Sequence, residues 1–574
     1  MNIFDKYRKL IIEIVESNKK KLNIKNTDNY KGVTVETPPV KFNYDLSCNI
    51  SLVLAKTNNL NPNTLAKELG NLFEKNLDGI EKIETLGPGF INIKLTNLSI
   101  QKIIQEIYRN KESYGSSQSN KNYNIEFVSA NPTGPLHVGH CRGAIYGDVL
   151  SNLLKFNGNN VVKEYYINDY GNQIINFTKS VFFRIREIKY KENFPKSENL
   201  YPGEYVIIIA EKIIDSFAKN KFDKFEENYD FLSKQSLVYA MELIKDDLNK
   251  LGVKHDNFFS EKDLIERNLI SKTIETLKGK KLVEEGFLQP PKGEENKNWK
   301  KIKRLIFKSS LFGDDNDRAL KKDDNTWTYF ANDIAYHSDK VSRKYDHLIN
   351  VLGADHTGYI KRISSAVQAL SDGKTKLTCK VSQLVKLYKN GKPFKMSKRS
   401  GDFISVNDLL NEVDKDSIRF MMLNRSNDVE LDFDFDKVKE KTKDNPVFYV
   451  QYCYARICSL SRSSKINLDD PIKFDIKNFN LNSYEIELLK KIFDWPRVLQ
   501  TASKKFEPHR IPFYLYDLST VFHSYWSKGN EDIKFRFLKD NKISNLNTLS
   551  IIKLLAVVIK KGMNILGVSL PNKM

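Results

Sequence analysis

Asn131-Pro-Thr-Gly-Pro-Leu-His-Val-Gly-His140 is the stretch from which the architecture of this 574-residue chain can be worked out. Before it, residues 124–128 alternate polar and apolar side chains as a short strand does. After it, apolar residues recur every three or four positions until Gly158, as in a helix, and a second strand-like run covers residues 161–167. This order predicts a βαβ unit in a parallel sheet, with a ligand site at the carboxyl ends of the strands.

The two histidines in this stretch predict a nucleotide site. His137 and His140 are three residues apart and would share one face of the first helical turn. Imidazole N–H groups and a helix N-terminus attract phosphate, and Gly139 would let a base or ribose approach the backbone closely. We therefore expect ATP to bind here. The alternative is that both histidines have only a structural role at the start of a helix.

Composition narrows the class of protein. Lys and Arg total 92 against 72 Asp and Glu, so the net charge is +20 and an anionic partner such as nucleic acid is favoured. The excess is mostly lysine, accompanied by abundant Asn and Ile, so a coding bias is the alternative. The five cysteines form no C-x-x-C pair, which argues against disulfides and a metal site. Since no apolar run is long enough to span a membrane, we expect a cytoplasmic protein.

The helix and strand signals divide the chain into four regions. Residues 1–110 predict a small α+β module. Residues 120–385 alternate strand and helix signals and predict a parallel-sheet domain, interrupted by a charged insertion at about 185–300. Residues 386–430 form a connecting region, and residues 431–574 are helical throughout.

Two expectations concern how these regions join. Residues 110–123 are rich in Ser, Asn, Lys and Gly and predict a polar linker. Residues 302–307 have a strand pattern, and we expect them to resume the main sheet after the insertion.

A second phosphate-binding device is predicted at Pro393-Phe-Lys-Met-Ser-Lys-Arg-Ser-Gly-Asp402. Lys395, Lys398 and Arg399 surround a serine, and Gly401 supplies flexibility. Such cations neutralise the charge that develops on a pyrophosphate leaving group, and losing such stabilisation commonly costs about 10²-fold to 10³-fold in rate. The alternative is a solvated basic loop.

Together, the two segments resemble the two signatures of class I aminoacyl-tRNA synthetases. Longer likenesses at residues 126–144, 166–173, 351–356 and 566–574 resemble arginyl-tRNA synthetase of the bacterial type, and the resemblance covers essentially the whole chain. One departure is that the loop keeps Lys398 and has Arg399 in place of the usual final serine. How much Lys395 and Lys398 each contribute to stabilising the leaving group therefore stays open.

The resemblance implies a fold and a set of site residues. The expected fold is α/β, with a Rossmann-like catalytic domain that carries an insertion, an N-terminal α+β module and a C-terminal all-α anticodon-binding domain. The expected catalytic residues are His137, His140, Lys395 and Lys398. The expected ATP-binding residues are His137, Gly139, His140, Lys395, Met396, Ser397, Lys398, Asp355 and His356. The expected arginine-binding residues are Glu126, Ser129, Asn131, His137, Tyr329, Asp333 and His356.

The chemistry of arginine independently favours two of these residues. A guanidinium needs planar anionic acceptors, and a desolvated pocket must pair its charge. Glu126 near the end of a strand and Asp333 near the start of a helix are suitable carboxylates. A surface role for either carboxylate is the alternative.

The resemblance also implies the reaction and its partners. L-Arginine would be activated with ATP and Mg²⁺ to arginyl-adenylate, then transferred to the 2′-hydroxyl of the terminal ribose of tRNA(Arg), and activation in this family often requires bound tRNA. The N-terminal module would contact the tRNA elbow and the C-terminal domain its anticodon. We expect a monomer. The candidate tRNA-binding aromatics are Tyr449, Tyr452, Tyr454 and Trp526. The alternative is that these side chains belong to the apolar core.

Two other functions remain open from the residues alone. A nucleotidyltransferase with the same histidine motif, acting without tRNA, would explain the ATP site but leave the helical C-terminal region unused. A non-catalytic tRNA-binding protein would use the basic charge, but we would expect it to have lost one of the two signatures.

Overall fold

The structure, a computed structural model, describes residues 2–27, 30–39, 42–288, 302–394, 404–474 and 479–574. The chain forms two compact units. We call residues 118–439 the central unit, and residues 1–117 together with 440–574 the terminal unit. No helix among the described residues is long and apolar enough to cross a membrane.

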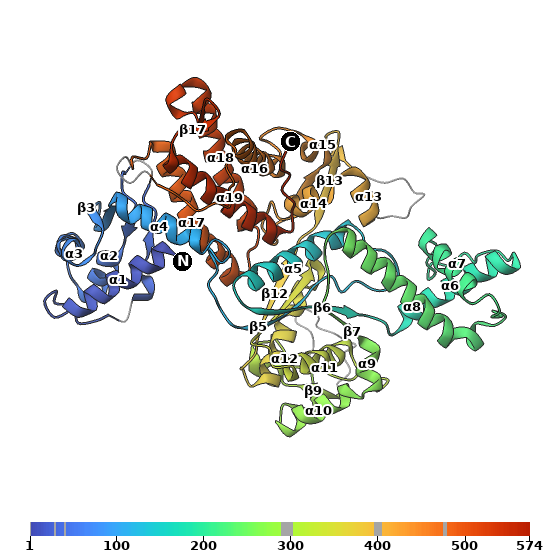
Figure 1. Cartoon of the computed structure of the whole chain (residues 1–574). Helices are drawn as coiled ribbons and strands as arrows, with labels where there is room; N and C mark the ends of the chain where they lie inside the picture. Colours follow the sequence, from blue (N-terminus) through green and yellow to red (C-terminus); the bar gives the residue numbers. More distant parts are fainter. Residues whose placement is uncertain (1, 28–29, 40–41, 289–301, 395–403, 475–478) are drawn as a thin grey trace. The chain divides into compact units, whose positions relative to one another are not determined.

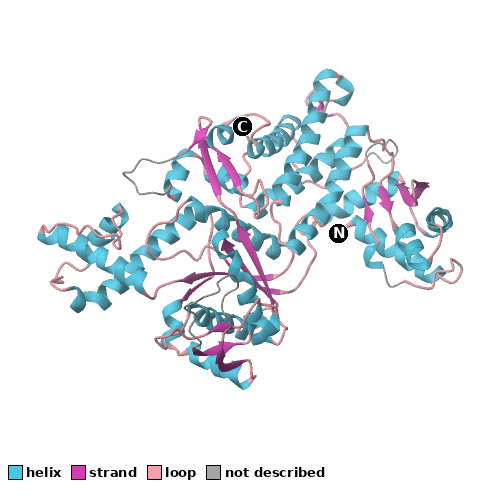
Figure 2. Cartoon of the chain, turned by 180° about the vertical axis from the view of Figure 1, so that it is seen from behind, coloured by secondary structure: helices cyan, strands magenta, loops and turns pink. Residues whose placement is uncertain are grey.

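The central unit is built on a five-stranded sheet in the order β12-β11-β5-β6-β7, in which all neighbouring strands are parallel. Its strands, drawn in magenta in Figure 2, are β5 (Asn122–Glu126), β6 (Asn160–Ile167), β7 (Asn257–Ser260), β11 (His347–Gly353) and β12 (Lys376–Ser382). Helix α5 (Val138–Phe156) connects β5 to β6, which confirms the predicted βαβ unit. Because the strands are parallel, their carboxyl ends share one edge, with β5 at its middle.

A helical excursion separates β6 from β7. It contains α6 (Asn172–Tyr190), α7 (Glu204–Ser216) and α8 (Phe225–Lys250), and Figure 1 shows α6 and α7 at the far end of α8. The excursion has its own apolar core, which includes Phe177 and Ile209. Strand β7 lies inside the range 185–300 that we expected to be an insertion, yet it pairs with β6 in the main sheet. A strand of four residues is too short to give a clear periodic signal.

A second, antiparallel sheet follows. Helices α9 (Glu261–Glu266) and α10 (Leu269–Gly279) lead into strands β8 (Val283–Phe287), β9 (Lys303–Phe307) and β10 (Arg318–Ala319). The expectation that residues 302–307 resume the main sheet is wrong, because β9 pairs antiparallel with β8 and β10. An apolar pattern identifies a strand but not its partner. Helices α11 (Tyr329–Ser342) and α12 (Ile360–Ser371) then flank β11, and η3 (Ala354–Tyr359) links β11 to α12.

The central unit ends in a three-stranded sheet and short helices. The elements are β13 (Val385–Lys389), β14 (Lys392–Pro393), α13 (Val406–Glu412), α14 (Lys415–Met422), β15 (Leu431–Asp434) and α15 (Phe435–Lys439). Residues 431–434 are thus a strand of the central unit rather than the start of a helical region. The buried Arg142 of α5 donates hydrogen bonds to the carbonyls of Gln383, Ser426 and Val429, and these bonds tie the region to α5.

The predicted α+β module and helical region are both present, and together they form the terminal unit. Its antiparallel sheet, in the order β1-β2-β4-β3, contains β1 (Val35–Glu36), β2 (Leu46–Cys48), β3 (Ile80–Leu86) and β4 (Phe90–Leu95). The module's helices are α1 (Ile3–Asn18), α2 (Ile50–Asn58), α3 (Pro62–Asn76) and α4 (Asn97–Arg109). The helical region contains α16 (Pro446–Ser464), α17 (Ser483–Lys505), α18 (Arg510–Glu531), α19 (Leu546–Leu566) and the hairpin β16 (Leu538–Lys539) and β17 (Lys542–Ile543).

The predicted polar linker contains a buried anchor. Tyr114 is 2% exposed and donates a hydrogen bond to the carbonyl of Ile492 on α17. In return, the indole N–H of the buried Trp495 donates to the carbonyl of Tyr114 at 3.2 Å. Gly115 adopts a φ of 95°, and a Cβ there would lie 2.8 Å from the Trp495 ring, so this turn requires glycine. The linker is therefore partly a packed element of the terminal unit.

Candidate active site

The chain turns sharply just after β5. Val128 and Ser129 have φ angles of 72° and 44°, a left-handed conformation that is strained for a β-branched residue such as Val128. The Ser129 hydroxyl donates to Glu126 Oε1 at 3.2 Å and accepts from the backbone N–H of Tyr166 at 3.1 Å. The strained turn therefore orients the Glu126 carboxylate at the carboxyl edge of the sheet.

The Glu126 carboxylate is paired with a buried cation. Lys340 of α11 is fully buried, and its Nζ lies 2.5 Å from Glu126 Oε2. The same ammonium donates a second hydrogen bond to Asn350 Oδ1 on β11, at 3.2 Å. Sequence reasoning placed Glu126 correctly at the strand end but missed Lys340.

Asp333 lies in the first turns of α11 and accepts a hydrogen bond from the Tyr359 hydroxyl. Burial raises the pKa of Asp333 to about 7, and the nearby carboxylates of Glu126 and Glu261 add to the rise, while the Tyr359 hydrogen bond and Lys340 oppose it. Near neutral pH this carboxyl group therefore exchanges between its two protonation states. A bound cation would hold it ionised.

A hydrogen-bond chain connects Asp333 to Lys340. Because Asn350 Oδ1 accepts from Lys340, the Asn350 amide must donate to His337 Nε2, at 3.0 Å. His337 Nδ1 then carries the proton and donates to the backbone carbonyl of Asp333, at 2.8 Å. Burial lowers the pKa of His337 to about 3, so the ring stays neutral. This chain fixes the first turns of α11 relative to β11.

A cavity of about 680 Å³ opens beside this cluster. Its lining includes Asn168, Gln173, Glu261, Trp327, Tyr329 and Asn332. Tyr329 is 78% exposed, so its ring is available to a ligand. The half-buried Asn332 donates to Glu261 Oε1 at 3.0 Å, while its buried Oδ1 has no hydrogen-bond partner among the residues that the structure describes.

Glu261 is a site candidate that sequence reasoning missed. It directly follows β7, and burial raises the pKa of its carboxyl group, with a further contribution from the charge of Asp169. The available signal was its position after the short apolar pair Phe258-Phe259, at a strand end. Assigning residues 185–300 to an insertion hid that signal.

Asn131 contacts the cavity wall rather than Glu126. Its amide donates to Gln173 Oε1 at 2.7 Å, and its Oδ1 accepts from Asn168 at 3.1 Å. Both partners line the cavity.

The two histidines form the N-terminus of α5. His137 is the N-cap residue, and the ring centroids of His137 and His140 are 3.9 Å apart, so the expected shared face is observed. His137 Nδ1 accepts from the Gly139 N–H, and His140 Nδ1 accepts from the His137 N–H. In each neutral ring the proton therefore resides on Nε2, which makes Nε2–H the donor of that ring. Burial lowers the pKa of both rings, that of His140 to about 3.

Gly139 has a structural reason to be glycine, while the expected close approach of a base or ribose stays a prediction. A Cβ at this position would lie 2.9 Å from Cε1 and 3.0 Å from Nδ1 of His137. The missing side chain thus makes room for the His137 ring itself, which packs over the turn.

Lys395, Met396, Ser397 and Lys398 lie outside the described residues, which resume at Ile404. The Ile404 carbonyl accepts from the Val138 N–H at 2.9 Å, and the Val406 N–H donates to the Leu136 carbonyl at 3.0 Å. The backbone just after the lysine signature is therefore hydrogen-bonded to the histidine turn.

Asp355 and His356 follow β11 at the same edge of the sheet. Their side chains are 79% and 58% exposed, and they lie 3.4 Å from each other. The structure therefore leaves both groups open to solvent. Among the described residues, no three His, Cys, Asp or Glu side chains are grouped as metal ligands.

In the terminal unit, three of the four candidate tRNA-binding aromatics surround one cation. Arg456 of α16 lies 4.3 Å from the Tyr452 ring and 4.9 Å from the Trp526 ring. The Tyr449 ring lies 4.3 Å from His523, which in turn contacts Arg456. Tyr454 is separate from this group, because it faces Cys458 on the opposite side of α16.

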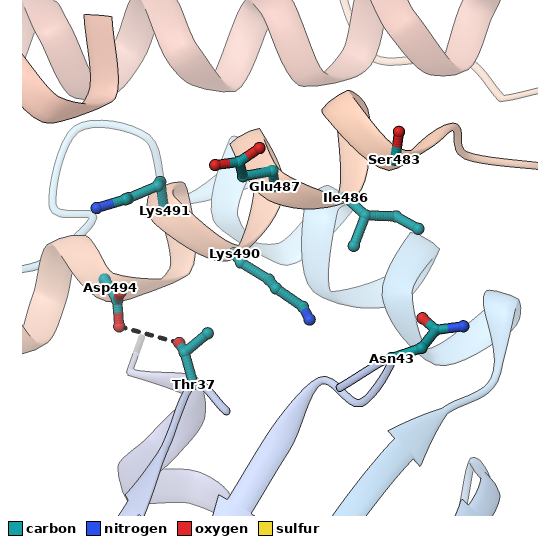
Figure 3. Close-up of a pocket in the computed structure, with 8 residues that line it drawn as sticks. All are labelled: Thr37, Asn43, Ser483, Ile486, Glu487, Lys490, Lys491 and Asp494. Carbon is teal, nitrogen blue, oxygen red and sulfur yellow. Dashed lines mark hydrogen bonds between the residues drawn. The ribbon is translucent and has the colours of Figure 1, made fainter. Parts of the chain in front are cut away.

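The terminal unit also contains a cavity of about 350 Å³ between the α+β module and α17. Figure 3 shows Lys490 extending from α17 toward the space between Thr37 and Asn43, and Thr37 donates a hydrogen bond to Asp494. Its lining residues are Thr37, Asn43, Ser483, Ile486, Glu487, Lys490, Lys491 and Asp494. None of the predicted site residues lines this cavity.

Known protein families match the chain along most of its length. The family described as "tRNA synthetases class I (R), catalytic domain" matches residues 103–457. "Arginyl tRNA synthetase N terminal domain" matches residues 6–95, and "DALR anticodon binding domain" matches residues 450–574.

Full-length relatives are also similar. The chain is 53% identical over 577 residues to an "Arginine--tRNA ligase" of Pelagibacter ubique, with 100% of both chains covered. It is 42% identical over 578 residues to the protein of that name in Roseobacter denitrificans, with 99% of both covered.

Two solved structures share the fold. Arginyl-tRNA synthetase of Thermus thermophilus matches with a TM-score of 0.70 at 18% identity, covering 99% of this chain and 100% of that one. The Plasmodium falciparum enzyme matches with a TM-score of 0.68 at 18% identity, with 99% of both chains covered. With the parallel sheet and the two flanking regions, these matches confirm the predicted fold class.

Proposed function

We propose, from the premise that this chain belongs to the class I arginyl-tRNA synthetase family and is an arginine–tRNA ligase, that arginine binds at Asp333 and ATP at the His137 turn. The two other functions that the residues left open do not account for a likeness that extends over the catalytic and anticodon-binding regions alike.

The proposal of an arginine site rests on the raised pKa and the charge environment of Asp333. Its carboxyl group has a pKa of about 7 because it is buried near two other carboxylates, and the cation facing it, Lys340, is already paired with Glu126. A guanidinium would pair with Asp333 and relieve this repulsion. Asn332 Oδ1, a buried acceptor without a described partner, would take a further guanidinium N–H. We propose that Glu126, Ser129, Asn131, His137, Tyr329 and His356 complete the pocket.

The ATP site would adjoin the arginine site through α5. His137 and His140 present Nε2–H donors toward the triphosphate, and the α5 N-terminus adds its positive dipole. Lys395, Met396, Ser397 and Lys398 would approach from the other side, because the backbone that follows them is bonded to this turn. Asp355 and His356 would contact the nucleotide at the sheet edge, and Mg²⁺ would enter with ATP as part of the substrate.

The reaction then proceeds in two steps. The arginine carboxylate attacks the α-phosphorus of ATP, which forms arginyl-adenylate and expels pyrophosphate. The 2′-hydroxyl of the terminal ribose of tRNA(Arg) next attacks the activated carbonyl carbon, which forms the ester and releases AMP. Positioning and charge stabilisation supply the catalysis, because no covalent enzyme intermediate is needed.

The tRNA contacts would lie in the terminal unit. We propose that Tyr449, Tyr452 and Trp526 stack on unpaired anticodon bases around Arg456, as aromatic side chains commonly do on single-stranded RNA. Tyr454 is a weaker candidate because it faces away from this group. The net charge of +20 supports electrostatic attraction of the tRNA. We further propose that the enzyme acts as a monomer in the cytoplasm.

Arginine-dependent exchange between ATP and pyrophosphate tests the proposal. Exchange is expected with arginine, and it is measured with and without tRNA(Arg) because tRNA often enables activation in this family. If no exchange occurs under either condition while ATP still binds, the proposed site is wrong. Exchange without subsequent aminoacylation would contradict the second step.

A further inference from the structure

A carboxylate from the helical excursion contacts the histidine turn. Asp247 lies near the C-terminus of α8, which Figure 1 shows running from α6 and α7 back toward α5. Asp247 is 2% exposed, and its Oδ2 accepts a hydrogen bond from the backbone N–H of Leu136 at 2.9 Å. Leu136 directly precedes His137, so this bond holds the backbone at the entrance to the turn.

The second oxygen of Asp247 faces the segment that follows the lysine signature. Lys250 of α8 donates to Asn407 Oδ1 at 2.8 Å, which directs the amide nitrogen of Asn407 toward Asp247. That amide then donates to Asp247 Oδ1 at 3.4 Å. Because Asn407 lies in the first turn of α13, Asp247 joins three separate parts of the chain: α8, the histidine turn and α13.

We infer that Asp247 is a positioning residue for ATP, acting through the Leu136 backbone and Asn407. The inference rests on the proposed ATP site at His137. Removing one acceptor oxygen would loosen both the approach to His137 and the segment after the lysine signature. This would weaken ATP binding much more than arginine binding, because His137 is the one proposed arginine residue in this turn.

The charges around Asp247 allow its positioning role to be distinguished from a purely stabilising one. The titratable groups that the described elements present to it are Asp246 and Lys250 of α8 and Cys141 of α5, while α13 presents a neutral amide. Burial raises the pKa of Asp247 to about 6, so its ionised form opposes folding. Its contribution to stability is therefore complete below its unfolded pKa of about 3.9 and is lost as the pH rises through 6.

The test is Asp247→Asn in the full-length enzyme, assayed by ATP–pyrophosphate exchange with arginine and tRNA(Arg). The asparagine retains one acceptor and cannot accept from both Leu136 and Asn407. We expect the KM for ATP to rise roughly tenfold to hundredfold, the effect of losing a hydrogen bond to a charged group, with a much smaller rise in the KM for arginine. At pH 8 the melting temperature should equal or exceed that of the wild type, because a buried charge has been removed.

The pH profile supplies a second readout. In the wild type, the KM for ATP should rise as the pH falls below about 6, and this dependence should be absent in Asp247→Asn. Glu242→Gln, which removes an exposed charge from the same helix, is the matched control and should behave as the wild type. Unchanged ATP kinetics in Asp247→Asn, or a lower melting temperature with equal effects on both substrates, would overturn the inference. Wild-type exchange is measured alongside and tests the proposed ATP site separately.

Discussion

Lys340 Nζ lies 2.5 Å from Oε2 of Glu126, so one of the two carboxylates that we propose for arginine is already paired within the protein. Among the described residues, Asp333 has no such ion pair, and it accepts a hydrogen bond from the Tyr359 hydroxyl. In the proposed site, the positive charge of the substrate would therefore matter most at Asp333, and Glu126 would contribute mainly through its fixed orientation.

Replacing Lys340 should make the protein dependent on arginine for stability. Lys340→Met leaves Glu126 as a partly buried charge without its partner, which typically costs about 3–5 kcal/mol of unfolding free energy. Saturating arginine should raise the melting temperature of this variant more than that of the wild type, because the guanidinium then supplies the missing charge. Thermal unfolding with and without arginine measures both effects. The double variant Glu126→Gln, Lys340→Met should be more stable than Lys340→Met alone, and equal arginine shifts in variant and wild type would contradict this account.

Asp333→Asn should affect one substrate selectively. Losing a charge that pairs with a desolvated guanidinium should raise the KM for arginine by about a hundredfold. The KM for ATP should change little, because the variant leaves the His137 turn intact. Steady-state exchange kinetics at varied arginine and at varied ATP give both values, and equal changes would show that Asp333 does not contact the guanidinium.

Arginine binding should release a proton near pH 6.5. The pKa of Asp333 is about 7 in the free protein, and a guanidinium would lower it on binding. The stability that Asp333 contributes to the free protein is complete below about pH 4 and is lost as the pH rises through 7, so arginine should stabilise the protein more at pH 8 than at pH 6. Calorimetric titrations in two buffers of different ionisation enthalpy report the released proton. Asp333→Asn should abolish the release.

Gly139→Ala should separate activity from stability. Alanine favours a helix over glycine by about 1 kcal/mol, but its Cβ would lie 2.9 Å from Cε1 of His137 and displace that ring. We expect a melting temperature no lower than that of the wild type and a raised KM for ATP. Gly143→Ala is the matched control on the same helix, because its Cβ would have 3.9 Å to the nearest side chain, Val351. Similar kinetics in the two variants would mean that the position of the His137 ring is unimportant.

The aromatic group around Arg456 should matter for tRNA and not for arginine. Tyr452→Ala removes one proposed stacking surface and should raise the KM for tRNA(Arg) about tenfold, with arginine and ATP constants unaltered. Tyr454→Ala, on the other side of α16, serves as the comparison and should have a smaller effect. If Tyr454→Ala has the larger effect, the anticodon surface lies on the opposite face of the helix.

The sequence predicted those features that depend on local pattern. The βαβ unit around His137 and the helical C-terminal region follow from periodicities within a few turns of chain, and both are confirmed. Glu126 was found because it lies near the end of a strand that could be recognised. Strand β7 and Glu261 were not predicted, because a strand of four residues has too little periodicity to be distinguished from a loop.

Features that depend on distant partners were beyond local pattern. Lys340 resembles an exposed lysine on a helix, and only the fold brings Glu126 and Asn350 to its buried ammonium. Tyr114 is a buried anchor within a polar stretch, so composition favoured a linker. Strand β9 was recognised as a strand, but its antiparallel partners depend on tertiary context.

The backbone bonds that join Val138 to Ile404 and Leu136 to Val406 also set an order of events during synthesis. The histidine turn leaves the ribosome long before its partner segment, so a nascent chain cannot complete the proposed nucleotide site until most of the central unit has emerged. The terminal unit is delayed further, because it combines residues 1–117 with residues 440–574. Pairing between segments that are distant in the sequence slows folding, and the segments synthesised first stay unpaired until their partners are made. The proposed catalytic site is thus completed only late in the synthesis of each molecule.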